Sequence, residues 1–285
     1  MSIETILDLL RKAEYKVDGL VLRERLGINL NLDKSKTPKN ILKNLNVPYY
    51  MKDYRILRLI TGSGVIEINF AEYDVKTGDV LLIKEGSYFE VISSSDDIKG
   101  EVLAFVPERY NSALLMQDRN PVKIHPDQQD WERMSHLLYS AYSFASEEPY
   151  RKDIVEPMII ALFNSIILLA EDKEARQPSS RLENLFTRFT ELLSANRSGK
   201  HPVSYYADLL CVTPQYLSKA VSLTSGKTVT EWISKAVVTE AKLLLRETDR
   251  TVSEIGEALN FPTDSFFCRF FRKEAGMTPT EYRKR

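Results

Sequence analysis

The sequence predicts an α+β protein, in which a region of short strands with accompanying helices is followed by an all-α C-terminal domain. Three observations lead to this prediction: an apolar alternation with a period of two from about residue 49 to 106, a helical period from about residue 127, and an internal repeat in the last hundred or so residues. With 285 residues the chain is long enough for two domains, each with its own buried core.

The composition argues against a secreted, membrane-spanning or zinc-binding protein. The first residues, MSIETILDLLRKA, contain acidic side chains and lack the continuous apolar run of a signal peptide. The longest apolar stretch, from Pro157 to Ala170, is interrupted by Asn164 and is shorter than the roughly 20 residues that span a bilayer. The two cysteines, Cys211 and Cys268, show neither metal-ligand nor disulfide spacing. We therefore expect a cytoplasmic protein without membrane contact.

Charge separates the chain into an acidic and a basic part. Residues 1–179 hold 23 Lys and Arg against 28 Asp and Glu, whereas residues 180–285 hold 16 against 12. A basic surplus attracts the phosphates of nucleic acids, although a small surplus is also common among solvated helical domains. The charge alone does not separate these two interpretations, and the residue pattern must decide between them.

The N-terminal part begins with a helical pattern and continues with strands. We expect helices within residues 2–26 and a polar loop over residues 27–46. In the segment VIEINF, Ile66, Ile68 and Phe70 occupy one face of a strand. Glycine-containing turns are expected at residues 61–64, 77–79 and 84–87. Several short strands at close spacing are typical of a small sandwich or barrel.

Two long helices are expected next, over residues 127–145 and 151–172, before the polar linker EDKEARQPSS. Five apolar residues of the second helix recur at spacings of three and four and form a stripe along it. They are Val155, Met158, Leu162, Ile166 and Leu169. The stripe has two open interpretations: it packs as core against the strands, or it forms the seam of a twofold dimer.

The last hundred residues contain a repeat. A segment that begins at Val203 recurs at Val252, at an offset of 49 that becomes 50 after the extra Pro262. Matched pairs include Ala207 with Gly256, Leu210 with Leu259, Leu217 with Phe267, Lys219 with Arg269, and Gly226 with Gly276. The chain therefore holds two copies of one supersecondary unit.

Each copy has the anatomy of a helix-turn-helix. In the first copy Ser204 is a candidate cap of a short helix, and Thr213, followed by a proline, begins a second helix. In the second copy Thr251 or Ser253 begins the short helix and Thr263 caps the next one. A small residue in each first helix lets the second helix approach closely. A bundle of duplicated helix pairs without a ligand is the alternative.

One connecting helix, expected from Thr230 to Arg246, joins the two copies. At about 1.5 Å per residue it spans roughly 25 Å. Paired helix-turn-helix units read DNA at sites about 34 Å apart. A single chain is thus able to reach two successive major grooves.

Residues 181–285 resemble the DNA-binding domain of the AraC family of bacterial regulators. The second copy, VSEIGEALNF followed by DSFFCRFFRKEAGMTPTEYR, matches the signature of that family in its expected order. The first copy matches through its cap, Leu217, Gly226 and the run AKLLL. Three positions depart from the family pattern: Val237 replaces an arginine, Asn260 a turn glycine and Gly256 an alanine.

The resemblance implies which side chains read DNA. Contacts to base edges fall on Gln215, Ser218 and Lys219 in the first reading helix, and on Asp264, Ser265, Cys268 and Arg269 in the second. Gln favours adenine, and Lys or Arg favours guanine, in the major groove. Asp264 accepts only from cytosine or caps its own helix, and both roles stay open. Arg272 and Lys273, with the tail residues 283–285, are expected at phosphates.

The strand region resembles the cupin-like regulatory domain that precedes this DNA-binding unit in many AraC-family regulators. A metal-dependent cupin needs histidines on neighbouring strands, and the three histidines here, His125, His136 and His201, lie outside the expected strands. Tyr88 and Phe89 stand where metal-binding cupins carry His, and they either fill the barrel or stack on a ligand. We expect no metal, no cofactor and no enzymatic activity.

These observations predict three parts of the chain. They are a cupin-like regulatory domain with N-terminal helices in residues 1–125, a helical dimerisation or linker segment in 126–178, and a double helix-turn-helix DNA-binding domain in 180–285. The expected function is a sequence-specific transcription regulator controlled by a small-molecule effector. The alternatives are a ligand-free regulator whose barrel is a dimerisation clamp, and a metal enzyme with a DNA-binding tail. The expected partners are double-stranded DNA, a second copy of the chain and RNA polymerase; the sequence names no effector.

Overall fold

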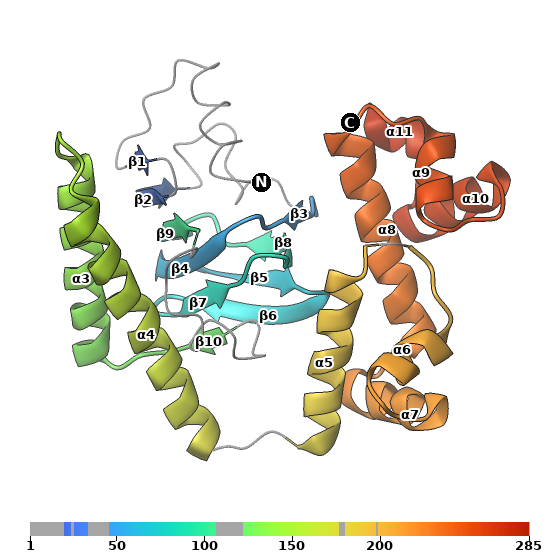
Figure 1. Ribbon diagram of the computed structural model, residues 1–285, viewed down its shortest axis with the longest axis horizontal. Coiled ribbons are helices and arrows are strands. Elements are labelled where there is room, and N and C mark those ends of the chain that lie inside the picture. Colours follow the sequence, from blue (N-terminus) through green and yellow to red (C-terminus); the bar gives the residue numbers. More distant parts are fainter. Residues whose placement is uncertain are drawn as a thin grey trace. The chain divides into compact units, whose positions relative to one another are not determined.

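The chain forms two compact units (Figure 1). The computed structural model describes residues 20–23, 26–33, 46–106, 122–176, 180–197 and 199–284. One unit contains most of the described chain up to residue 176, and the other contains the residues from 180 onward. The first unit is rich in strands and the second is helical, which confirms the α+β class.

The strands of the first unit build two antiparallel sheets. In chain order they are β1 (Leu20–Arg23), β2 (Leu26–Asp33), β3 (Tyr49–Tyr50), β4 (Tyr54–Thr61), β5 (Ser63–Ile68), β6 (Ala71–Lys76), β7 (Val80–Ile83), β8 (Tyr88–Ser94), β9 (Lys99–Phe105) and β10 (Val122–Ile124). One sheet has the order β1-β2-β9-β4-β7-β10 and the other β3-β8-β5-β6. Among the described strands no pairing joins the two sheets, so the expected barrel is an open sandwich.

Glycines hold three of the turns between these strands. Gly62, Gly78 and Gly86 have φ angles of 83°, 87° and 83°. This left-handed region strains a residue that carries a Cβ atom. The turns expected at residues 61–64, 77–79 and 84–87 are therefore confirmed.

The expectation for residues 20–33 was wrong. A helix was expected up to residue 26 and a loop beyond it, whereas β1 and β2 pair as antiparallel strands there. The reason is an alternation between Leu26, Ile28 and Leu30 and the small or polar residues Gly27 and Asn29. Leu26 and Ile28 are buried in the core. The expected helix over residues 2–19 lies outside the described residues.

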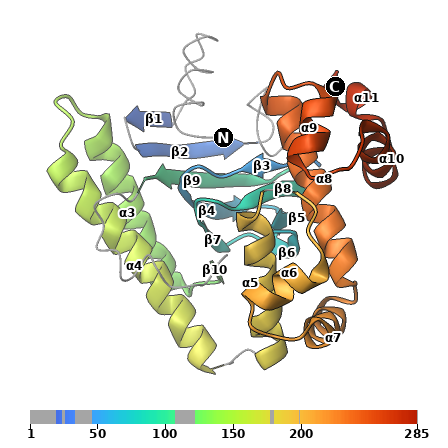
Figure 2. The ribbon, with the colours of Figure 1, turned by 45° about the vertical axis from the view of Figure 1, so that its right-hand side comes forward.

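Two helices cover the outer face of the six-stranded sheet (Figure 1, Figure 2). They are α3 (Gln128–Ser146) and α4 (Lys152–Arg176). Asp127 caps α3 by accepting a hydrogen bond from the Asp130 backbone N–H. Strand residues such as Ile56, Leu82 and Leu103 pack with both helices in one core.

The stripe on α4 lies against this core. Val155, Leu162 and Ile166 are fully buried in it, and Met158 and Leu169 pack against it while partly exposed. A side chain that is already covered within one chain has no surface to offer a second copy. The structure thus favours the interpretation of the stripe as core over its interpretation as a dimer seam.

In the described part of the chain, one helix is long and apolar enough to cross a membrane. This is α4, with a mean hydropathy of 1.9 over Lys152–Asp172. The core helix of a soluble protein meets the same criterion, and one side of α4 packs in a common core with α3 and the six-stranded sheet.

A buried ionic cluster joins the sheet to α3. Arg58 of β4 donates to the Glu101 carboxylate at 2.8 Å and to the Ser135 hydroxyl at 2.5 Å. Its guanidinium lies 4.1 Å from the centroid of the Trp131 ring, and Tyr139 donates to the other Glu101 oxygen at 2.7 Å. Burial lowers the pKa of the guanidinium, while Glu101 and Tyr139 act to raise it.

The second unit consists of helices around a long central one. They are α5 (Arg181–Ala195), α6 (Val203–Leu209), α7 (Pro214–Ser225), α8 (Val229–Glu247), α9 (Val252–Ala258), α10 (Asp264–Ala275) and α11 (Pro279–Arg283). Both views show α6 and α7 at one end of α8, and α9 and α10 at its other end (Figure 1, Figure 2). The connecting helix starts one residue before and ends one residue after its expected bounds.

We expect Arg58→Met to destabilise the first unit by about 3–5 kcal/mol, because it leaves the Glu101 carboxylate buried without its cation. Urea unfolding followed through Trp131, in a Trp232→Phe background, measures this change. The double variant Arg58→Met with Glu101→Leu should regain most of the loss, since it removes the charge as well. A double variant as unstable as the single one would show that the charge is not what matters.

Candidate DNA-binding interface

The two helix pairs have the same backbone geometry. In the first turn Cys211 has a φ of 56°, and in the second Asn260 has a φ of 59°. The Val212 N–H donates to the Ala207 carbonyl at 3.0 Å, and the Phe261 N–H donates to the Gly256 carbonyl at the same distance. The repeat seen in the sequence is thus a repeat in structure. Asparagine tolerates the left-handed region better than other residues with a Cβ atom, which explains why it replaces a glycine in this turn.

The first helix of each pair approaches the second closely at its small residue. A Cβ atom placed on Gly256 would lie 3.2 Å from the Cβ of Phe267, a tight contact. Ala207 stands at the matching position, and its Cβ is fully buried. Leu217 and Phe267, which match across the repeat, are also fully buried. These contacts fix how each second helix projects from the unit.

Both reading helices, α7 and α10, start and end in the same way. Thr213 accepts from the Tyr216 N–H at 3.2 Å, and Thr263 accepts from the Phe266 N–H at 3.4 Å. Glycines in the left-handed conformation end the two helices, Gly226 with a φ of 69° and Gly276 with a φ of 75°.

The short first helices differ at their starts. Thr251 caps α9 through a capping box with Glu254, so this candidate was correct and Ser253 lies inside the helix. In the first copy the capping position is Pro202, which makes no side-chain cap, and Ser204 lies within α6. The expectation that Ser204 caps this helix was therefore wrong, because the chain turns into the helix two residues earlier.

Capping boxes recur along the second unit. The carboxylates of Glu183, Glu231, Glu254 and Glu281 each accept from the backbone N–H of the Ser or Thr that caps their helix. These backbone hydrogen bonds, with those of the capping hydroxyls, lower the pKa of all four carboxyl groups from the ordinary value of 4.5.

The side chains expected to read bases lie on the solvent side of α7 and α10. Gln215, Ser218 and Lys219 are exposed on α7, opposite the buried Leu217 and Val221. On α10 the exposed ones are Asp264, Ser265 and Arg269, and Cys268 is half-buried. Two sets of side chains at matching positions are thus exposed on helices at the two ends of α8, where the sequence analysis expects base contacts.

Several basic and acidic residues have local partners. Ser253 donates to the Asp264 carboxylate at 3.0 Å, so Asp264 joins α10 to α9, while Thr263 is the cap. Arg272 and Lys273 are exposed near the end of α10. Arg283, expected with the tail at phosphates, donates to the carbonyls of Leu245 and Arg250.

Phe266 is an exposed aromatic side chain of α10 that the sequence pattern did not single out. It follows Ser265 in the first turn of α10, and 53% of its surface is exposed. The Arg269 guanidinium carbon lies 4.8 Å from the centroid of its ring. The spacing of the phenylalanines predicts this exposure. Phe267 and Phe271 are four residues apart and form the buried side of the helix, so Phe266 lies on a different face.

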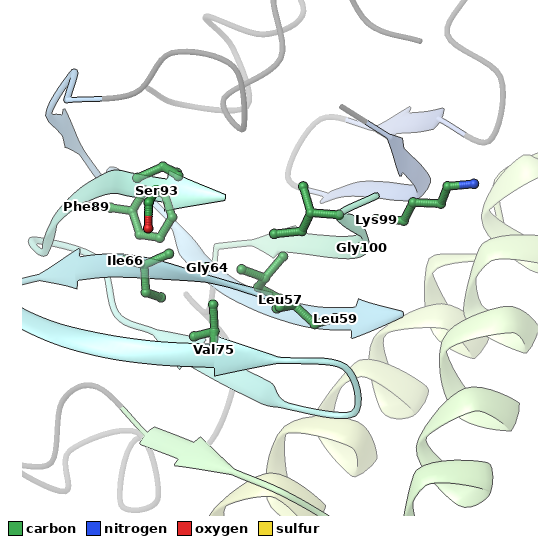
Figure 3. Close-up of a pocket in the computed structure, with 11 residues that line it drawn as sticks. Leu57, Leu59, Gly64, Ile66, Val75, Phe89, Ser93, Lys99 and Gly100 are labelled. Atoms are coloured by element: carbon green, nitrogen blue, oxygen red, sulfur yellow. The ribbon is translucent and has the colours of Figure 1, made fainter. Parts of the chain in front are cut away.

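The first unit has a small cavity between its two sheets (Figure 3). Its lining is mostly apolar and comes from both sheets: Leu57, Leu59, Gly64, Ile66, Val75, Phe89, Val91, Ser93, Ile98, Lys99 and Gly100. Its volume is about 20 Å³, room for about one water molecule. Phe89 is among the lining residues, whereas Tyr88 is buried elsewhere. In the described residues no three His, Cys, Asp or Glu side chains are grouped to hold a metal ion.

Comparison with known proteins assigns both units. Residues 206–285 match the family described as a helix-turn-helix domain, and residues 51–159 match the AraC-like ligand binding domain. The arabinose operon regulatory protein of Salmonella typhimurium is 23% identical over 244 residues, which are 83% of this chain and 85% of that protein.

Other relatives cover the chain to different extents. The HTH-type transcriptional activator RhaR of Mannheimia succiniciproducens is 24% identical over 256 residues, 84% of this chain and 87% of that protein. The uncharacterized HTH-type transcriptional regulator YpdC of Escherichia coli is 23% identical over 151 residues, so the chain aligns with about half (52%) of its length. The crystal structure of ToxT from Vibrio cholerae O395 superposes with a TM-score of 0.42 and 14% identity, covering 92% of this chain and 98% of that one.

The capping boxes predict an acid-sensitive second unit. A carboxyl group whose pKa is lowered by folding stabilises the folded state above its unfolded pKa, and this stability is lost as the pH falls through the folded pKa. Glu254→Gln with Glu281→Gln keeps an acceptor for each cap but does not titrate. Between about pH 6 and about pH 3 its stability should fall less steeply than that of the wild type, as urea unfolding by circular dichroism measures. Parallel profiles would contradict the role of these two groups.

Proposed function

The chain belongs to the AraC family of transcriptional regulators, and from this premise we propose that its two helix-turn-helix units read two successive major-groove segments of one DNA duplex. The strongest support is the presence of two matching units at the ends of one helix. α8 has 19 residues, and at about 1.5 Å per residue it is about 28 Å long. Grooves on one face of the duplex recur about every 34 Å, so a helix of this length is a suitable spacer.

Within each reading helix, position decides the role of a side chain. Gln215 and Lys219 of α7, and Arg269 of α10, have the donors that recognise purine edges in the major groove. Ser218 and Ser265 accept or donate to either kind of base, and Cys268 contributes a small half-buried side chain. Arg272 and Lys273 contact phosphates, which position the protein without reading sequence.

The N-terminal unit is proposed to respond to a small apolar molecule held between its two sheets. The enclosed lining offers hydrocarbon side chains, while Ser93 and Lys99 are exposed. A hydroxyl group buried there without a partner costs roughly 1–3 kcal/mol. One relative is named for the arabinose operon, but a sugar would bury several hydroxyls in this cavity. An apolar effector that pushes the sheets apart suits the lining better.

A regulator without an effector is the second candidate. The observation that favours it is the size of the cavity, about 20 Å³. In that case the first unit serves as a dimerisation clamp, and the amount of protein sets its activity. Thermal denaturation of the full chain with apolar carboxylic acids and with sugars separates the two, because a molecule that binds only the folded state raises the melting temperature.

We place the dimer seam on the side of α4 that faces away from the core. Pro157, Ala161 and Leu168 are exposed there, and Leu168 is 60% exposed. A helix that is apolar on all sides requires cover on each of them. This surface replaces the stripe of Val155 and its neighbours as the proposed contact of a homodimer.

The remaining partners follow from the proposed role. The relatives are regulators of transcription, and we propose no catalytic activity and no cofactor for this chain. We further propose that it acts in the cytoplasm, with RNA polymerase as a partner if it activates transcription.

Arg269 and Lys273 should respond differently to replacement by alanine. Arg269→Ala should weaken binding to the selected site by about 1–3 kcal/mol and relax preference at one base pair. Lys273→Ala should weaken binding to all sequences alike and reduce the magnitude of the salt slope by about one unit. Titrations of labelled duplexes at several salt concentrations measure both. Equal loss of preference in both variants would contradict the assigned roles.

Ala161→Glu with Leu168→Glu should convert the dimer into a folded monomer, since it places charge on the exposed side of α4. Sedimentation equilibrium gives the mass, and circular dichroism confirms the fold. The matched variant, Met158→Lys with Leu162→Glu, targets the buried side and should lower stability. A dimer that persists in the first variant excludes this surface.

A further inference from the structure

Phe266 is an aromatic side chain held open to solvent on a reading helix. It is 53% exposed, whereas its neighbour Phe267 and the next-turn Phe271 are fully buried. Full burial of a phenyl ring contributes about 1.5–3 kcal/mol to stability. The half-exposed ring of Phe266 contributes only part of this free energy. Its position in the first turn of α10 places it beside Ser265, among the residues that face DNA in the proposed function.

Phe266 and Arg269 form one unit. They are three residues apart on α10, a spacing that brings side chains together on one helix face. The Arg269 guanidinium lies over the Phe266 ring, 4.8 Å from its centroid. This cation–π contact restricts the rotamers of a long flexible side chain before DNA is bound, which lowers the entropy lost on binding.

The two side chains recognise different base edges. A guanidinium donates to O6 and N7 of guanine, and a phenyl ring contacts the C5 methyl group of thymine. Because ring and guanidinium are only 4.8 Å apart, the two bases that they contact must belong to neighbouring base pairs, which are about 3.4 Å apart along the duplex.

Resting on the proposed function, we infer that α10 reads a two-base-pair step in which Phe266 contacts the methyl group of a thymine and Arg269 binds the adjacent guanine. Phe266 is thus a further specificity-determining residue of this regulator.

The first reading helix lacks this unit. Tyr216 stands at the position that matches Phe266, but it is half-buried, and the cation near it is Arg181 of α5, 5.9 Å from the ring centroid. Lys219 stands at the position of Arg269. The thymine–guanine preference is therefore specific to the half-site bound by α10.

The experiment uses the full-length protein and duplexes selected from a random library. Sites selected by the wild type should contain thymine beside guanine in one half-site, and Phe266→Ala should lose the thymine while it keeps the guanine. Replacing that thymine by deoxyuridine removes only the methyl group. This should weaken wild-type binding about fourfold, the effect of one buried methyl-sized group, and leave Phe266→Ala binding unchanged.

Leu223→Ala is the matched control. Leu223 is 65% exposed and lies near the C-terminal end of α7, so its loss should leave the selected sequences and the deoxyuridine effect as in the wild type. Equal wild-type affinity for thymine and deoxyuridine duplexes would overturn the inference while DNA reading by Arg269 stands. Failure to select any sequence would contradict the proposed function itself, and this inference with it.

Discussion

The close approach of two helices across a left-handed turn is the constraint on which the reading surfaces depend. The turn residues Cys211 and Asn260 have nearly equal φ angles, 56° and 59°. At Gly256 the helices are so close that an added Cβ atom would lie only 3.2 Å from the Cβ of Phe267. A larger residue at this position would push α10 away from α9. Since α7 and α10 are fixed in the same way against their partners, the exposed sides of both helices are set by contacts buried behind them.

Under the proposed function, this fixed placement explains how one backbone unit, present twice, supports two different chemistries of base recognition. The buried residues of α7 and α10 match in position, with phenylalanines in α10 where α7 has smaller aliphatic residues. The exposed sides differ in chemistry, with a lysine at one end of α8 and an arginine stacked on an aromatic ring at the other. In the first unit, strands β4 and β9 combine two tasks in a similar manner. Leu57 and Gly100 line the cavity, while Arg58 and Glu101 hold α3 from the opposite face.

The second unit was predictable from the sequence because its helix ends are marked by nearby residues. The first unit was less predictable because its sheets depend on pairings between residues far apart in the sequence. Thr263 and Gly276 mark the ends of α10 because a cap and a left-handed glycine act within one helix turn. The eight-residue β2 was missed because glycine, asparagine and aspartate, which are depleted in strands, alternate with its leucines and isoleucine. Whether the sheets close into a barrel depends on pairings between distant strands. The α4 stripe indicated that its residues are buried, but not which surface covers them. Phe266 was not singled out because it is adjacent in sequence to Phe267, a core residue of the same type.

The spacing of the two half-sites tests the central claim most directly, namely that one chain reads two grooves through units fixed by α8. Inserting about five base pairs between the half-sites turns one groove to the far side of the duplex, because a helical turn has about 10 base pairs. Binding should then fall to the affinity of a duplex with a single half-site, and an insertion of about ten base pairs should not restore it, since α8 cannot lengthen. Unchanged affinity of the full chain for the five-base-pair insertion would contradict the account and leave a single helix-turn-helix as the reader.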